Sequence, residues 1–357
     1  MSQTNKDTGA IPVTVLTGYL GAGKTTLLNR VLTENHGKKY AVIVNEFGEI
    51  GIDNDLVVGA DEEVFEMNNG CICCTVRGDL IRIIGSLLKR REKFDAILVE
   101  TTGLADPAPV AQTFFTDDDV KKKTRLDSII TVVDAKHIEQ RLADSNEAEE
   151  QIAFADIVLL NKTDLVSPEQ VKKIEARIRS LNPFATIHHT VRSGIALNEI
   201  LDKGAFDLNR VLELDPCFLH GHAFDPTHDH GHGHDHDHHH DHGHDHHHHA
   251  HDAANPLHDS DIRSISLTSD KPLSAAKFDT WVNDVLMGQG QDILRCKGIL
   301  NMAGNDNRFV FQGVHMVSEG AYTGAWPAKD KRRSRIVLIG RKLDEAALRK
   351  GFEDCVA

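Results

Sequence analysis

The sequence predicts an α/β domain with a mostly parallel sheet, followed by a smaller α+β domain. Three observations lead to this prediction. Short apolar runs alternate with amphipathic stretches through the first 210 residues, a tract of His, Asp and Gly then interrupts the chain, and further short elements follow it. Short buried strands separated by helices are typical of parallel βαβ units with helices on both faces of the sheet. A length of 357 residues also exceeds what one ordinary domain needs.

Five apolar runs in the first part of the chain are expected to form buried strands. Helical patterns follow several of them. Because ligands of such sheets bind beyond the carboxyl ends of the strands, we expect the chemistry in the loops after the strands. The expected strands span 13–16, 41–45, 96–100, 128–133 and 157–160, and the helical patterns include 25–35 and 168–181.

The second unit is expected to begin near Asp261, after a segment that cannot form a core. Its pattern indicates a small α+β domain and no chemistry of its own. We predict strands over 264–268, 293–302, 308–317 and 334–339, and helices over 274–286 and 344–352. The predicted divisions are a disordered N-terminus (1–10), the α/β domain (11–215), a disordered linker (216–260) and the C-terminal α+β domain (261–357).

Composition and charge exclude several classes of protein. Segment 220–259 holds eight Asp and no Lys, Arg or Glu, so it carries more than half of the formal net charge of −14, and the charge gives no support for a nucleic-acid surface. No run of about 18 apolar residues suggests a membrane span, and residues 1–10 lack an apolar signal core. Half of the six cysteines crowd into 71–74, which suits soft metals better than disulfides. We expect a cytoplasmic protein with no nucleic-acid or membrane partner.

Residues 18–25 match the phosphate-binding loop (P-loop) pattern at every fixed position, between an expected strand and a helix. Backbone N–H groups of such a loop converge on phosphate oxygens at a helix N-terminus, whose partial charge favours anions. We therefore predict a P-loop NTPase domain, with Lys24 as a catalytic residue that reaches the terminal phosphates and the Thr25 hydroxyl on Mg²⁺. The expected nucleotide-binding residues here are Gly18, Gly21, Ala22, Gly23, Lys24, Thr25 and Thr26.

A second nucleotide motif, Asn-Lys-Thr-Asp at 161–164, directly follows the strand 157–160. A carboxylate there can accept hydrogen bonds from both the ring N–H and the exocyclic amine of guanine, a contact that adenine cannot make. We therefore expect GTP rather than ATP, bound by Asn161, Lys162 and Asp164. Segment 192–194 (Arg-Ser-Gly) follows another apolar stretch and is a candidate to close over the base.

The strand 96–100 ends in Glu100 and is followed by Thr-Thr-Gly at 101–103. We expect Glu100 to be catalytic, by holding Mg²⁺ through a water or by orienting the attacking water, and Gly103 to approach the γ-phosphate. A strand-end acid that faces solvent is the alternative. No Gln stands in an obvious water-positioning place, so the hydrolytic residue stays open.

Three cysteines at Cys71, Cys73 and Cys74 indicate a metal site. Three thiolates within four residues can close on one soft ion, and tetrahedral zinc would accept them with one more ligand. Our candidate for that ligand is Glu49, with Glu46 behind it. Buried small side chains and redox thiols are the alternatives. The motif lies between the P-loop and the Glu100 strand, the region that switches conformation in many GTPases.

A His-rich tract at 228–251 alternates His with Asp and Gly. Flexible neutral imidazoles bind Zn²⁺, Ni²⁺, Co²⁺ and Cu²⁺ with little geometric selection. We expect the tract to collect, buffer or sense metal, and a solvated linker without that role is the alternative. Its expected accessory ligands include His228, His230, His232, His234 and His236.

Together these motifs resemble the CobW-type metal-handling P-loop GTPases, and the likeness covers nearly the whole chain. The resemblance implies GTP hydrolysis coupled to metal delivery, with zinc or cobalt on the Cys-x-Cys-Cys thiols and His-rich insertions recurring in the family. Segment 100–107 is most similar to the zinc-transferase branch. The segments that carry the resemblance are 18–25, 45–49, 70–74, 100–107, 161–164, 312–315 and 336–341.

The expected function is therefore a GTP-hydrolysing zinc metallochaperone, and several alternatives stay open. One is a cobalt chaperone for cobalamin synthesis or nitrile hydratase activation. Others are a nickel GTPase for hydrogenase or urease maturation, which the thiols disfavour, a His-rich metal buffer, and a redox switch. We expect Mg²⁺ and Zn²⁺ as cofactors, with Co²⁺ as the alternative metal. The expected partners are GTP or GDP and an unidentified client metalloprotein, and a homodimer stays open.

Overall fold

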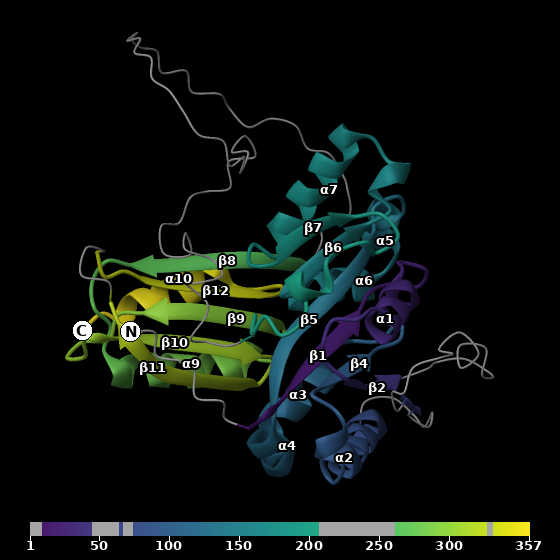
Figure 1. Cartoon of the computed structure of the whole chain (residues 1–357). Helices are drawn as coiled ribbons and strands as arrows, with labels where there is room; N and C mark the ends of the chain where they lie inside the picture. Colours follow the sequence, from purple (N-terminus) through teal and green to yellow (C-terminus); the bar gives the residue numbers. More distant parts are fainter. Residues whose placement is uncertain (1–8, 45–63, 67–73, 207–260, 327–330) are drawn as a thin grey trace, which may run out of the picture.

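The computed structural model describes residues 9–44, 64–66, 74–206, 261–326 and 331–357 (Figure 1). A seven-stranded parallel sheet is formed by the first part of the chain, and a five-stranded antiparallel sheet by the last part. The α/β domain and the C-terminal α+β domain predicted from the sequence are confirmed. The expected linker 216–260 and most of the expected N-terminal segment lie outside the described residues.

The parallel sheet brings the ends of several strands to one level. Its order is β3-β2-β4-β1-β5-β6-β7. Glu100 is in register with Leu16 on one side and with Val44 on the other, and Val44 is in turn in register with Glu66. The carboxyl ends of β1, β4, β2 and β3 therefore meet at one side of the sheet. The strands are β1 (Ile11–Thr17), β2 (Tyr40–Val44), β3 (Val64–Glu66), β4 (Ala96–Glu100), β5 (Thr124–Asp134), β6 (Ile157–Asn161) and β7 (Thr186–Thr190).

Helices cover both faces of this sheet (Figure 1). Alternate strand residues point to opposite faces: Ile97 and Val99 join a core with α2, α3, α6 and α7, whereas Leu98 joins a core with α1. Local signals fix the helix ends; at the start of α7, Ser167 and Gln170 form a reciprocal capping box. The helices are α1 (Lys24–Thr33), α2 (Cys74–Leu88), α3 (Ala108–Thr116), α4 (Asp118–Lys123), α5 (Ile138–Asp144), α6 (Asn146–Phe154) and α7 (Pro168–Leu181), with 3₁₀ turns η2 (Arg91–Lys93), η3 (Thr163–Leu165) and η4 (Leu197–Glu199).

The C-terminal domain packs two helices on its antiparallel sheet, whose order is β11-β10-β9-β12-β8. Phe278 of α9 and Phe352 of α10 lie in a core with strand residues such as Leu338. No helix in the described ranges is long and apolar enough to cross a membrane. The elements are β8 (Ile262–Ser269), α9 (Ala275–Gln289), β9 (Ile293–Leu300), β10 (Asn307–Val314), β11 (Val317–Ala325), β12 (Ser334–Arg341) and α10 (Glu345–Asp354).

Three strands, β3, β7 and β11, were not predicted, and one predicted strand ends earlier than expected. β7 has the sequence Thr-Ile-His-His-Thr and β11 is mostly exposed, so neither shows an apolar run. The strand expected over 308–317 ends at Val314, because His315 has a φ of 50° and the chain turns back into β11. A hairpin replaces a single strand there.

A buried ion cluster joins the two sheets. Asp156, between α6 and β6, is 4% exposed, and its carboxylate pairs with Arg295 and Lys297 of β9. Burial acts to raise the pKa of Asp156, but the two cations hold this pKa below its ordinary value. Arg295 also donates to the carbonyl of Phe154, the last residue of α6. Breaking such a cluster would leave a buried charge unpaired, so it fixes the C-terminal sheet against α6.

Candidate nucleotide site and metal motif

The P-loop connects β1 to α1 at the carboxyl end of the sheet. β1 ends at Thr17 and α1 begins at Lys24, so residues 18–23 form the connecting loop. Gly23 caps α1 with a φ of 117°, and a Cβ on it would lie 2.5 Å from Nδ2 of Asn161. Only glycine fits this position. The loop thus leaves its backbone N–H groups at a helix N-terminus, where an anion is favoured.

Lys24 is the first residue of α1, and it is buried, with 8% of its surface exposed. Its ammonium donates to the carbonyls of Gly18, at 2.7 Å, and Tyr19, at 3.4 Å. Burial lowers the pKa of Lys24, and the nearby Glu100 charge opposes that shift. A buried ammonium with one carboxylate nearby is suited to bind phosphate oxygens by charge-assisted hydrogen bonds.

Glu100 is buried at the end of β4, 9% exposed, so it does not face solvent. The next residue is tied to β1 twice: Thr101 donates its N–H to the Leu16 carbonyl at 2.9 Å and its hydroxyl to Thr17 Oγ1 at 2.9 Å. These bonds place the segment after β4 directly beside the P-loop. Glu100 and Gly103 are therefore brought to the same side of the sheet as Lys24.

Several groups at this place fit a magnesium nucleotide. Thr25, half-buried in the first turn of α1, and Glu100 provide the hard oxygen atoms that Mg²⁺ prefers. Thr102 Oγ1 is buried and has no hydrogen-bond partner in the described part of the chain, so a further hard oxygen is open to a ligand. Mg²⁺ held by these oxygen atoms would offset the negative charge of the phosphates. Thr26, one residue further along α1, is exposed.

Asn161 joins three parts of the site. Its Nδ2 donates to the Ala22 carbonyl at 2.9 Å, while its Oδ1 accepts from Thr190 Oγ1 at 3.1 Å and from the Ser193 N–H at 2.8 Å. Both ends of its amide are therefore engaged within the protein. Asn161 therefore holds the P-loop and segment 192–194 together.

The predicted guanine contact is open to a ligand. Asp164 lies exposed in η3 and makes no hydrogen bond or ion pair with any other described residue. Lys162, in contrast, donates to the Gly21 carbonyl at 2.8 Å and to Asp134 Oδ2 at 2.7 Å. The motif therefore separates into residues that fix the P-loop and a carboxylate that is free to select the base.

Segment 192–194 lies against the P-loop, where the sequence placed a candidate for closing over the base. Arg192 and Ser193 both have positive φ angles, 51° and 52°. Ser193 is fully buried and its hydroxyl donates to the Gly23 carbonyl at 3.0 Å. The turn is held by Arg30 of α1, which donates to the carbonyls of Ser193 and Ile195.

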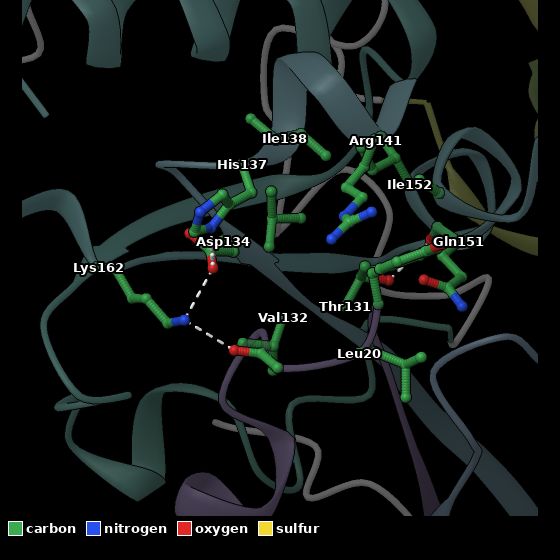
Figure 2. Close-up of a pocket in the computed structure, with 14 residues that line it drawn as sticks. Leu20, Thr131, Val132, Asp134, His137, Ile138, Arg141, Gln151, Ile152 and Lys162 are labelled. Atoms are coloured by element: carbon green, nitrogen blue, oxygen red, sulfur yellow. Dashed lines mark hydrogen bonds and ion pairs between the residues drawn. The ribbon is translucent and has the colours of Figure 1, made fainter. Parts of the chain in front are cut away.

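A cavity of about 220 Å³ lies beside the P-loop, between β5 and helices α5 and α6 (Figure 2). Asp134 stands at one end, where it accepts hydrogen bonds from Lys162 and from His137. Burial acts to raise the pKa of Asp134, but these bonds hold it below its ordinary value. The Arg141 guanidinium lies 4.9 Å from the centre of the Tyr19 ring. No motif in the sequence marks Asp134, although it directly follows the expected strand 128–133.

Most of the predicted metal ligands lie outside the described residues. These are Glu49, Cys71, Cys73 and the tract that includes His228, His230, His232, His234 and His236; Glu46 also lies outside. Cys74 is the first residue of α2. Within the described ranges no group of three or more His, Cys, Asp or Glu is placed to hold a metal ion. Two described thiols, Cys296 and Cys355, are buried, and burial raises their pKa to about 12 and about 11.

The parallel sheet, the P-loop around Lys24 and the open carboxylate of Asp164 define the class of protein as a P-loop guanine-nucleotide-binding protein. Comparison with known families agrees. Residues 12–189 match the model of the CobW/HypB/UreG nucleotide-binding domain, and residues 262–356 match that of the cobalamin synthesis protein cobW C-terminal domain.

Full-length relatives extend this match. Zinc chaperone YjiA of Escherichia coli is 32% identical over 96% of this chain and 98% of its own length. Zinc-regulated GTPase metalloprotein activator 1 of Schizosaccharomyces pombe is 34% identical over 93% of this chain and 83% of its own. The crystal structure of Zn(II)-bound YjiA GTPase from E. coli superposes with a TM-score of 0.73, at 29% identity, covering 98% of this chain and 99% of that one. The chain therefore belongs to the CobW family of P-loop GTPases.

Proposed function

We propose that this GTPase is a zinc metallochaperone that binds Zn²⁺ through the thiolates of Cys71, Cys73 and Cys74, with Glu49 as the fourth ligand, and passes the ion to a client metalloprotein. The ion is cargo rather than a resident cofactor. Three thiolates and one carboxylate suit tetrahedral zinc, and the carboxylate is the ligand most readily exchanged.

The observation that carries the proposal is the register of β2, β3 and β4. β2 ends at Val44, five residues before Glu49 in the sequence, and β3 ends at Glu66, five residues before Cys71. Val44 is in register with both Glu66 and Glu100. Neighbouring strands lie about 4.8 Å apart. Both metal-motif segments are thus tethered, at one level, beside the strand end that carries Glu100.

This tethering supports a two-state cycle. GTP and Mg²⁺ order the segment with Glu49 and the cysteines and raise its affinity for zinc, and hydrolysis relaxes it and releases the ion to a docked client. Lys24, Glu100 and Gly103 act on the nucleotide at the place from which that segment starts. A coupling of about 1.4 kcal/mol is enough for a tenfold change in affinity. The proposal includes a cytoplasmic setting, in which the three thiols stay reduced.

The relatives support zinc as the metal, since their names include zinc chaperone and zinc-regulated GTPase. A Zn(II)-bound crystal structure of YjiA in which one Glu and two neighbouring Cys are replaced by Ala is also similar to this chain, with a TM-score of 0.73. Zinc thus binds that variant without those three side chains. A test on this chain must therefore separate the thiolate site from accessory sites such as the His tract.

The test is a competition titration with Zn²⁺ and Co²⁺ against a chelator, on a variant that lacks residues 228–251. It is run with Mg²⁺ and either GDP or a non-hydrolysable GTP analogue. We expect one tight Zn²⁺ site with the GTP analogue, lost on Cys73→Ser and retained on Cys296→Ser, a buried cysteine in the other domain. A site that survives Cys73→Ser refutes the thiolate assignment, and tighter Co²⁺ than Zn²⁺ binding identifies a cobalt chaperone instead.

A further inference from the structure

Gln151 of α6 is hydrogen-bonded to the loop that follows β4. The side chain is fully buried, and its Nε2 donates to the carbonyls of Gly103, at 3.1 Å, and Ala105, at 3.3 Å. Its own backbone carbonyl accepts from the hydroxyl of Thr131 in β5, at 2.7 Å. One residue therefore ties the loop after β4 both to α6 and to the centre of the parallel sheet. Figure 2 shows Gln151 at the edge of the cavity, far from Asp134 and Lys162.

Gly103 is held from its other side by the P-loop. A Cβ on Gly103 would lie 2.6 Å from the backbone nitrogen of Leu20, so the two backbones are in close contact. Gly103 also has little freedom to move away, because it lies only two residues after Thr101, whose N–H is bonded to the Leu16 carbonyl. With Leu20 on one side and Gln151 on the other, the position of Gly103 beside the P-loop depends on both contacts.

The buried amide of Gln151 carries a cost in folding free energy. Its Oε1 is buried and has no hydrogen-bond partner among the described residues. An unsatisfied buried acceptor is unfavourable, so an apolar side chain of the same size would fill this space at lower cost. What the amide adds is its two donors, and both are used on the Gly103 loop.

The neighbours of Gln151 on α6 contact the C-terminal domain. Glu150 is 8% exposed and pairs with Arg341 of β12. Phe154 ends the same helix and accepts from Arg295 of β9. Within nine residues, α6 therefore touches the loop that contains Gly103 and two strands of the antiparallel sheet.

We propose that Gln151 is a positioning residue for GTP hydrolysis, which presents the backbone of Gly103 to the γ-phosphate, and that α6 passes the resulting shift of this loop to the C-terminal domain through Glu150 and Arg341. The inference rests on GTP binding at the P-loop and is independent of zinc delivery. Failure of the zinc site would leave it intact.

The first experiment compares Gln151→Met with the wild-type chain. Methionine keeps the volume and the helix but removes both donors. We expect affinity for a non-hydrolysable GTP analogue to fall about tenfold, as for the loss of two neutral hydrogen bonds, and kcat to fall with it. Affinity for GDP, which lacks the γ-phosphate, stays within about twofold. The control is Gln140→Met, the same change at an exposed site on α5. Equal weakening of GDP and the GTP analogue would overturn the positioning role.

A second variant separates positioning from simple packing. Gln151→Glu places a carboxylate against the two carbonyls, but once protonated it regains one donor. Because burial raises the pKa of a carboxyl, we expect its affinity for the GTP analogue to recover as the pH is lowered from about 8 to about 6, while that of Gln151→Met does not. Parallel pH profiles for the two variants would contradict the proposal.

The relay is tested by hydrogen–deuterium exchange in β12 of the full chain. We expect amide protection there to differ between GDP and the GTP analogue in the wild type, and this difference to vanish in Gln151→Met. It also vanishes in Arg341→Met, in which hydrolysis and nucleotide affinities stay as in the wild type. Identical protection of wild-type β12 in both nucleotide states would overturn the relay.

Discussion

The Lys162 ammonium lies 2.7 Å from Asp134 Oδ2 and 2.8 Å from the Gly21 carbonyl. A single side chain thus joins the ends of β5 and β6 to the P-loop. We therefore expect the guanine motif to contribute to phosphate binding as well as to base selection, because Lys162 holds the P-loop in place.

Asp134→Asn is expected to weaken binding of GDP and GTP alike, about fivefold, because Lys162 loses a charged partner and holds Gly21 less firmly. The pKa of Asp134 is lowered in the fold from an ordinary value of 3.8. The stabilisation that the ionised Asp134 gives to the folded chain is therefore complete above a pH of 3.8, and it is lost as the pH falls through the lower, folded pKa. Fluorescent-nucleotide titration checks this, and unchanged affinity at neutral pH would refute the fastening role.

Asp164→Asn is expected to change base preference without changing stability. Guanine offers two donors to the carboxylate, and an amide can accept only one of them while its NH₂ faces the other. GTP affinity should fall about a hundredfold, because a charge-assisted hydrogen bond is replaced by two N–H groups that face each other. Xanthine, which has one donor and one acceptor there, should gain affinity. Competition among GTP, XTP and ATP measures this, and an unchanged ranking would exclude Asp164 from base recognition.

Gly23→Ala is expected to reduce nucleotide affinity by more than about tenfold, because φ is 117° and the new Cβ meets the amide of Asn161. The matched control is Gly85→Ala in α2, where a Cβ meets nothing within 4 Å. There alanine favours the helix, and stability should rise by about 1 kcal/mol. Nucleotide titration measures the loss of affinity in Gly23→Ala, and thermal unfolding measures the gain in stability in Gly85→Ala. Full nucleotide affinity in Gly23→Ala would contradict the geometry of this turn.

Asp156→Asn is expected to destabilise the chain by about 3–5 kcal/mol, because Arg295 and Lys297 stay buried without their counter-charge. Asp202→Asn is the control, since this carboxylate pairs with Lys38 and Arg125 at the surface and should contribute about 1 kcal/mol or less. The pKa of Asp156 is lowered from 3.8, so its stabilisation is complete above that value and lost on acidification below it. Denaturant unfolding measures the free energy of unfolding of both variants. Equal destabilisation by the two substitutions would contradict the stabilising role of the buried ion cluster.

Much of the nucleotide site could be predicted because its motifs are local. The strand expected over 96–100 coincides with β4, and the strand over 157–160 falls one residue short of β6. Apolar runs and short motifs report burial and loop position directly. The His-His pair in β7 breaks the apolar pattern and carries no such signal, so that strand was missed.

Gln151 could not be predicted for a different reason. Its partners are backbone carbonyls 46 and 48 residues earlier in the chain, and no side-chain pattern marks them. In the sequence it is one polar residue in a helix with a run of acidic neighbours. The same holds for Asp156, whose partners Arg295 and Lys297 belong to the other domain.

In the proposed cycle nucleotide state and zinc affinity are coupled, and such coupling must be reciprocal. The most direct measurement is the affinity of the full chain for a non-hydrolysable GTP analogue and for GDP, with and without saturating Zn²⁺. We predict that zinc tightens the GTP analogue about tenfold, leaves GDP unchanged, and has no such effect in Cys73→Ser. Equal affinity for the GTP analogue with and without zinc would contradict nucleotide-gated delivery.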